Sequence, residues 1–215
     1  MIYGNPDLKS ETSHNFSVSA EYTKNRYNFS VTGYYNLVHN RINTVYSEDP
    51  KGQIYTNTDK VDIAGVDANI SAKYPCGLGF RMSYTYIHEF MRDGQKKFTD
   101  TRPHTATVRV DWGENLDKVD FNYSLNGRIL SEVKTNVYND SFNNPAAGST
   151  AVTYPGYMIW DLTFSVGVFK GVNMNLAINN LFNYVPDYYY FNSPTTTGAN
   201  LTLGLSLDID RFFKK

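Results

Sequence analysis

Few residues in this chain are spaced for catalysis or metal binding. The four histidines, His14, His39, His88 and His104, are scattered and lack the spacing of a metal site. The paired acids in the segments SEDP and LDIDR are too few for a calcium loop. No Gly-x-Ser-x-Gly sequence and no phosphate-cradling glycine loop occurs. We therefore expect no enzyme, no catalytic residues, no metal site and no cofactor.

Aromatic side chains in two loop-like segments are better candidates for binding. They are Tyr138, Phe142, Tyr188, Tyr189, Tyr190 and Phe191. Flat rings of this kind can stack on a planar or hydrophobic ligand. The alternative is a belt of aromatic residues at the headgroup boundary of a membrane, where such residues gather. We take the six as candidate ligand contacts and leave both readings open.

The composition restricts the classes of protein to consider. The chain has 215 residues and a formal net charge of -1, without a basic run, which argues against nucleic-acid binding. Aromatic residues make up 15% of the chain, with 18 Tyr and 13 Phe, and this excess favours strands. No apolar run approaches the roughly 18 residues of a transmembrane helix. The single Cys76 cannot form an internal disulfide.

The elements that must carry these residues follow a period of two. In the segment DLTFSVGVFKGVNMNLAINN, apolar and polar residues alternate on both sides of a tight turn, which predicts a hairpin. The same alternation predicts about nine long strands joined in an antiparallel up-and-down meander. They cover residues 11–22, 27–46, 53–74, 80–86, 106–112, 119–129, 160–168, 172–179 and 201–209, with loops at 136–155 and 183–199.

The apolar face of these strands could point into a soluble sandwich or outward into lipid. Short connections (TKNR, PCGLG, GENLDK, FKG) alternate with longer polar ones, as in outer-membrane barrels. Several segments are also longer than ordinary globular strands. We therefore predict an all-β chain that forms part of a transmembrane barrel and is an open curved sheet by itself. The lipid-facing set includes Ile70, Phe121, Val166, Leu176 and Leu205, and the inward set Asp67, Arg109, Asp120, Arg128 and Asp161.

Three segments resemble signatures of one family. The stretch YGNPDLKSETS is similar to the Asn-Pro-Asp-Leu-Lys-Pro-Glu signature of TonB-dependent outer-membrane receptors, with Ser10 in place of proline. TDTRPHTATVRVDW resembles a segment that enters a later barrel strand, and NNLFNYV resembles the Asn-Leu-Phe-Asp/Asn motif near the end of the barrel. Their order along the chain matches that of the family.

This resemblance implies a location, a function and partners. Residues 1–215 would be the C-terminal part of a barrel of about 22 strands, without the N-terminal plug, in the outer membrane. The whole protein would import a scarce ligand, such as a siderophore-iron complex, haem or cobalamin. Its partners would be outer-membrane lipid, the TonB complex through the missing N-terminal part, and the β-barrel assembly machinery through the C-terminal strand.

Two rival functions stay open at this stage. A small complete outer-membrane barrel acting as an adhesin or pore would need an even number of strands and a signal peptide, and neither is visible. A soluble β-sandwich that binds a ligand would need short strands whose apolar faces converge.

Overall fold

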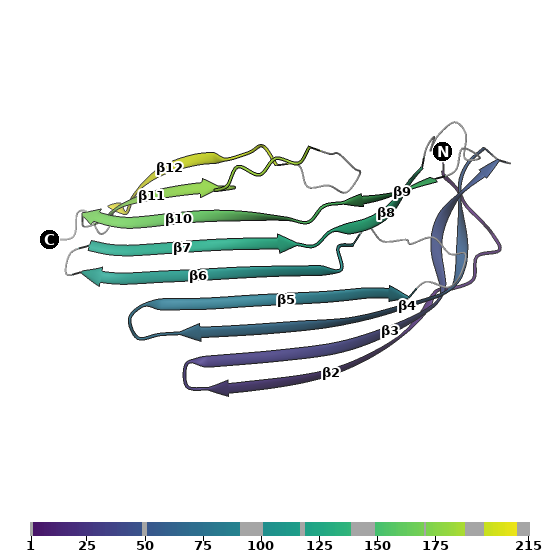
Figure 1. Cartoon of the computed structure of the whole chain (residues 1–215), viewed down its shortest axis with the longest axis horizontal. Helices are drawn as coiled ribbons and strands as arrows, with labels where there is room; N and C mark the ends of the chain where they lie inside the picture. Colours follow the sequence, from purple (N-terminus) through teal and green to yellow (C-terminus); the bar gives the residue numbers. More distant parts are fainter. Residues whose placement is uncertain are drawn as a thin grey trace.

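The computed structural model describes residues 2–48, 51–90, 101–116, 119–138, 149–169, 171–187 and 196–209. Within them the chain is built of strands (Figure 1): β1 (Ile2–Tyr3), β2 (Thr12–Lys24), β3 (Tyr27–Glu48), β4 (Lys51–Lys73), β5 (Leu78–Phe90), β6 (His104–Leu116), β7 (Val119–Leu130), β8 (Val133–Tyr138), β9 (Ser149–Tyr154), β10 (Tyr157–Phe169), β11 (Val172–Asn179) and β12 (Asn200–Leu207). None of the helical residues in the described ranges forms a segment long and apolar enough to cross a membrane.

Nine of these strands form the predicted meander. The order across the sheet is β12-β11-β10-β7-β6-β5-β4-β3-β2, and every neighbouring pair along it is antiparallel. One short strand was not foreseen: β1 pairs with β4 in parallel. In the described residues β2 and β12 each have one neighbour, so the sheet is open at both edges, as expected of a partial barrel.

The loop predicted at residues 136–155 is partly wrong. Its residues 136–138 and 149–154 belong to a second, two-stranded sheet in which β8 pairs with β9. Val133 is fully buried and lies opposite Tyr154, which is also buried. Each strand has only six residues, too few for a period of two to stand out from the surrounding Asn, Ala, Gly and Pro.

The strand connections differ at the two ends of the sheet. At the end drawn on the left of Figure 1, the turns are short, and three of them contain a residue with a left-handed backbone: Asn25 (φ 52°), Gly77 (φ 81°) and Gly171 (φ 81°). A Cβ on Gly77 would lie 1.8 Å from the carbonyl oxygen of Gly113, so this turn requires glycine. We call this the short-turn end and the opposite one the long-loop end.

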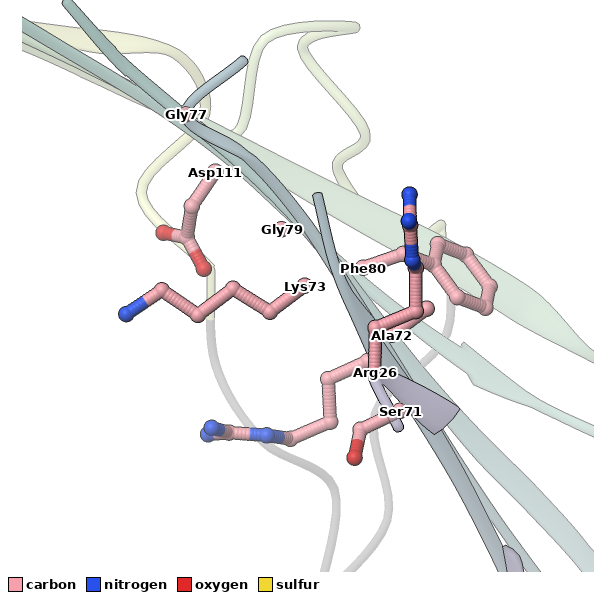
Figure 2. A pocket seen from close by; sticks show the side chains of 9 residues that line it. Arg26, Ser71, Ala72, Lys73, Gly77, Gly79, Phe80 and Asp111 are labelled. Carbon is pink, nitrogen blue, oxygen red and sulfur yellow. The ribbon is translucent and has the colours of Figure 1, made fainter. Parts of the chain in front are cut away.

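The strand register places residues of similar polarity on the same face of the sheet. Ile70 lies opposite Met82, which lies opposite Val108, so one row of the face is apolar from β4 to β6. One residue along, Asn69, Ser83 and Thr107 form a polar row on the other face. Figure 2 shows this alternation: Lys73 and Asp111 project to one side of the sheet and the Phe80 ring to the other.

The apolar face is not covered by a second layer. Val18, Leu203 and Leu205 are 80%, 73% and 73% exposed, whereas the interior of a sandwich would bury such residues. The described residues form one long sheet with a two-stranded extension, not two packed sheets. The sandwich reading is therefore wrong, and the apolar face needs a partner such as lipid.

Two aromatic belts border the apolar face. The inner belt, Tyr27, Tyr74 and Trp112, lies at the short-turn end, where the Tyr27 and Tyr74 rings meet edge to face at 6.1 Å. The outer belt lies toward the long-loop end and comprises Tyr84, Tyr86, His88, Phe90 and His104, with ring centroids 4.9 Å apart for Tyr86 and His104.

The spacing of the belts suits a membrane. Trp112 and His104 are eight residues apart on β6, about 27 Å along a strand at ~3.4 Å per residue. A strand tilt of about 40° reduces this to a height of about 20 Å, near the ~25 Å apolar band of outer-membrane barrels. We call the rows between the belts the membrane band.

Candidate functional site at the long-loop rim

The rim consists of the described residues at the long-loop end: residues 2–11, 38–61, 102–104, 131–135, 150–157, 180–187 and 196–199. It holds every large side chain that is buried in the described part of the chain. These are Val61, Arg102, Val133, Tyr154, Tyr157 and Asn180, each at most 9% exposed. The rim is therefore the packed part of an otherwise open sheet.

One of the six candidate ligand contacts lies in the described part of the chain. Tyr138 is the last residue of β8. Phe142, Tyr188, Tyr189, Tyr190 and Phe191 lie outside the described residues. The role of all six residues in binding stays a prediction.

The first signature segment fastens the β3–β4 hairpin. The Asn57 side chain accepts a hydrogen bond from Lys9 N at 2.8 Å and donates to the carbonyl oxygens of Lys9 and Asn40 at 2.9 and 2.7 Å. Glu11 accepts a hydrogen bond from Ile42 N at 2.9 Å, next to the left-handed Asn40 (φ 52°). The segment thus satisfies backbone groups where the hairpin departs from regular pairing.

The second signature segment places Arg102 between two strands. Its Nη1 donates to the carbonyl oxygens of Ser131 and Pro155, the latter at 2.7 Å, and its guanidinium lies 4.8 Å from the centroid of the Tyr157 ring. Arg102 is only 6% exposed. A buried arginine needs such acceptors, because an unpaired buried charge is costly.

The third signature segment folds around Asn180. Its side chain donates to the carbonyl oxygen of Tyr184 at 2.7 Å and accepts from Tyr184 N at 2.8 Å, and its own N–H donates to Asp161 at 2.8 Å. Asn180 has a left-handed backbone (φ 54°), which asparagine tolerates better than most residues. The Tyr184 ring in turn stacks on Tyr157 at 5.0 Å with an interplanar angle of 7°.

The inward face of the sheet carries the charges predicted for it. A shallow cavity of about 320 Å³ is lined by Arg81, Arg109, Arg128 and Asp161 among others. Register places Arg81 directly opposite Arg109, whose guanidinium is held by Asp111 at 2.8 Å. A second cavity of about 380 Å³ lies closer to the short-turn end, lined by Arg26, Lys73 and Asp111 among others (Figure 2). Both cavities are open and carry charged side chains in their lining, as a water-facing wall requires.

The short-turn end lacks a comparable packed cluster among the described residues. The Tyr27 and Tyr74 hydroxyls lie 3.4 Å apart, and this hydrogen bond raises the pKa of Tyr74. Arg26 lies 5.4 Å from the Tyr74 ring centroid, and Trp112 Nε1 donates to the Cys76 carbonyl oxygen at 3.2 Å. These contacts suit side chains at a membrane boundary and do not form a binding site.

Metal chemistry finds no support in the described part of the chain. It contains no group of three or more His, Cys, Asp or Glu residues that could hold a metal ion. His14 and His39 have ring centroids 6.3 Å apart, but no acidic or thiol side chain completes a set of ligands.

Sequence reasoning missed Arg102, Tyr157, Asn180 and Tyr184 as residues of one cluster. Arg102 and Asn180 were visible only as letters in two motifs 78 positions apart in the numbering. Nothing in the period-two pattern indicates that the chain brings them to neighbouring positions.

Comparison with known proteins identifies the architecture. Residues 1–181 match the family model for the TonB dependent receptor-like β-barrel. The iron-regulated outer membrane virulence protein of Vibrio cholerae serotype O1 (El Tor Inaba N16961) is 23% identical over 96% of this chain and 32% of the relative. This chain thus spans about a third of the length of that curated relative.

Solved structures give the same fold at lower identity. The FrpB iron transporter from Neisseria meningitidis aligns with a TM-score of 0.73 at 14% identity, covering 96% of this chain and 33% of that one. The FpvA receptor of Pseudomonas aeruginosa PAO1, solved with bound pyoverdine, aligns with a TM-score of 0.73 at 19% identity. The alignment covers 94% of this chain and 30% of that one. The open sheet, its two aromatic belts and the family match agree: this chain is an outer-membrane β-barrel segment that belongs to the TonB-dependent receptor family.

Proposed function

We propose that the protein to which this chain belongs imports siderophore-bound iron across the outer membrane with energy supplied through TonB. The observation that carries this proposal is the family match over residues 1–181. The iron-regulated curated relative favours iron over haem or cobalamin as the cargo. The pyoverdine-bound FpvA structure and the siderophore receptor PirA of Acinetobacter baumannii share the fold, and their ligands also favour a siderophore-iron cargo.

The proposal assigns residues 1–215 to the C-terminal part of the barrel. A plug and the segment that contacts TonB would precede them. The chain itself contributes a wall: apolar toward lipid, charged toward the lumen, and fastened at the rim. We also propose that the assembly machinery recognises the last strand, β12, together with the sequence DIDRFFKK that follows it.

Uptake of labelled iron tests the function. The full-length gene would be deleted and restored in its host, and the cells would be starved of iron and supplied with ⁵⁵Fe bound to a panel of siderophores. Restored uptake of at least one chelate, abolished when TonB is inactivated, supports the proposal. If the deletion strain grows normally on every chelate but no longer grows on haem or cobalamin, the cargo is haem or cobalamin and the proposed siderophore-iron cargo is wrong.

The six aromatic residues are proposed as ligand contacts. Alanine at Tyr188, Tyr189, Tyr190 and Phe191 together should weaken binding of the transported chelate, because stacking area is lost. The same change at Tyr138 and Phe142 tests the other loop. Tyr74→Phe, at the short-turn end, is the control that should leave uptake unchanged. If the loop variants bind as tightly as the wild type, these residues belong to a headgroup belt.

A further inference from the structure

The two sheets of this chain meet at a break that one side chain spans. Pairing of β7 with β10 ends at Leu130 and Tyr157, and pairing of β8 with β9 begins at Val133 and Tyr154. Between them, residues 131–132 and 155–156 belong to no strand. Figure 1 shows β8 and β9 beyond the ends of β7 and β10, at the side of the molecule where the N-terminus lies.

The residues at the break cannot continue the ladder. Pro155 has no N–H to donate. Ser131 is turned toward β6, where its N–H donates to the His104 carbonyl oxygen at 2.9 Å and its hydroxyl accepts from His104 N at 3.1 Å. Gly156 passes so close to β7 that an added Cβ would lie 2.8 Å from the Leu130 carbonyl oxygen. One side of the break is thus held by the start of β6, and the other passes close to the end of β7.

Arg102 supplies the missing connection. A single nitrogen, Nη1, donates to the carbonyl oxygen of Ser131, between β7 and β8, and to that of Pro155, between β9 and β10. The guanidinium also lies over Tyr157, the first residue of β10, and Tyr157 stacks on Tyr184. Arginine suits this position, because its planar fork can bond carbonyls while its face stacks on an aromatic ring.

We propose that β8 and β9 form an arm that pivots about residues 131–132 and 155–156, and that Arg102 is the pin that fixes its angle to the barrel wall. The arm is joined to the large sheet at this break, and in the described residues β8 and β9 pair with each other and with no strand of the large sheet. Arg102 is a positioning residue: it sets where the arm points without contacting a ligand. This inference concerns the ligand-free protein and holds whatever the receptor transports.

Hydrogen–deuterium exchange of the full-length receptor in detergent tests whether Arg102 fixes the arm. In Arg102→Gln, amides of 133–138 and 149–154 should exchange roughly ten- to a hundredfold faster, because the charged hydrogen bonds to both strands are lost. Amides of 105–112 and 121–128, in the regular part of β6 and β7, should keep their wild-type rates. Arg128→Gln is the matched control, since Arg128 is an exposed arginine on β7 three residues before Ser131.

The conservative variant keeps the test decisive if Arg102→Gln does not fold. Arg102→Lys retains the charge but loses the fork and the stacking, so the arm should exchange at a rate between the other two proteins. Wild-type rates in the arm of either variant would overturn the proposal. An equal acceleration in the arm and in β6 and β7 would also overturn it, because Arg102 would then stabilise the whole barrel rather than pin the arm.

Discussion

The membrane band and the rim are parts of the same strands but are stabilised in different ways. In the membrane band, apolar side chains such as Phe29 and Ile70 are 45% and 41% exposed, and no large side chain of the described residues is buried. At the rim, Arg102 and Asn180 are buried and make several hydrogen bonds each. The band relies on lipid to cover it, whereas the rim must complete its own packing in water.

The signature motifs belong to the region that completes its own packing. All three segments that resemble the family hold irregular backbone at the rim: Glu11 near the unpaired Asn40 of β3, Arg102 at the break between the two sheets, and Asn180 in the segment after β11. In the band, any apolar residue suits a lipid-facing position. At the rim, one side chain with defined donors and acceptors is required, and substitutions are correspondingly restricted.

The largest effect should come from placing a charge on the lipid side of the band. Ile70→Arg should destabilise the barrel by about 2–4 kcal/mol, the range for a cation near the bilayer midplane. Asn69→Arg, one residue earlier on the polar face, should cost less than about 1 kcal/mol. Denaturant unfolding of the receptor in lipid vesicles would compare them, and equal costs would show that the two faces are not distinguished by lipid.

At the rim, loss of the Asn180 side chain should be nearly as costly. Asn180→Ala removes two hydrogen bonds to Tyr184 and forces alanine into a left-handed backbone, for a total of about 2–4 kcal/mol. Asn180→Gly should recover about 1 kcal/mol of this, since glycine tolerates that backbone. The midpoint of denaturant unfolding in detergent measures both.

The neighbouring residue provides the control. Asn179 is exposed and makes a side-chain hydrogen bond to Asn200 at 2.8 Å. Asn179→Ala should cost less than about 1 kcal/mol. If Asn179→Ala and Asn180→Ala were equally destabilising, burial would not be what distinguishes the rim.

A smaller and more local effect is expected at the first signature segment. Glu11→Ala removes the acceptor for Ile42 N and should cost about 1–2 kcal/mol. Glu11→Gln keeps an acceptor and should cost less. Amide exchange at residues 40–45 should accelerate in the alanine variant, whereas the short-turn end of β3, residues 27–33, should be unaffected. A uniform acceleration along β3 would contradict a local fastening role.

The smallest effect is expected on the inward wall of the band. The Arg109–Asp111 pair is nearly half exposed, at 49% and 42% of the side chains. Asp111→Asn should therefore change the free energy of unfolding by less than about 1 kcal/mol, as is usual for exposed ion pairs. High salt should change the wild-type stability by a similarly small amount. A cost above 2 kcal/mol would show that this pair is structurally buried in the complete receptor.

The strands and their faces could be predicted from the sequence, but the cluster at the rim could not. Alternation such as Leu162, Phe164 and Val166 against Asp161, Thr163 and Ser165 depends on neighbouring residues alone. The pairing of β10 with β7 and β11 could be predicted because strands of a meander adjoin their neighbours in the sequence, and the structure confirms it. The β8–β9 arm is inserted in the chain between β7 and β10. The arm itself was assigned to a loop, since two six-residue strands show little periodicity.

The sequence by itself determined the all-β meander, the two faces, the short and long connections and the family. These properties follow from local periodicity and from short motifs whose letters lie together in the chain. Only the tertiary structure decided that Arg102 meets Ser131, Pro155 and Tyr157, and that Tyr157 meets Tyr184. The physical reason is that the break in the ladder leaves carbonyl groups that a distant donor must satisfy, and which donor reaches them depends on how neighbouring strands are aligned.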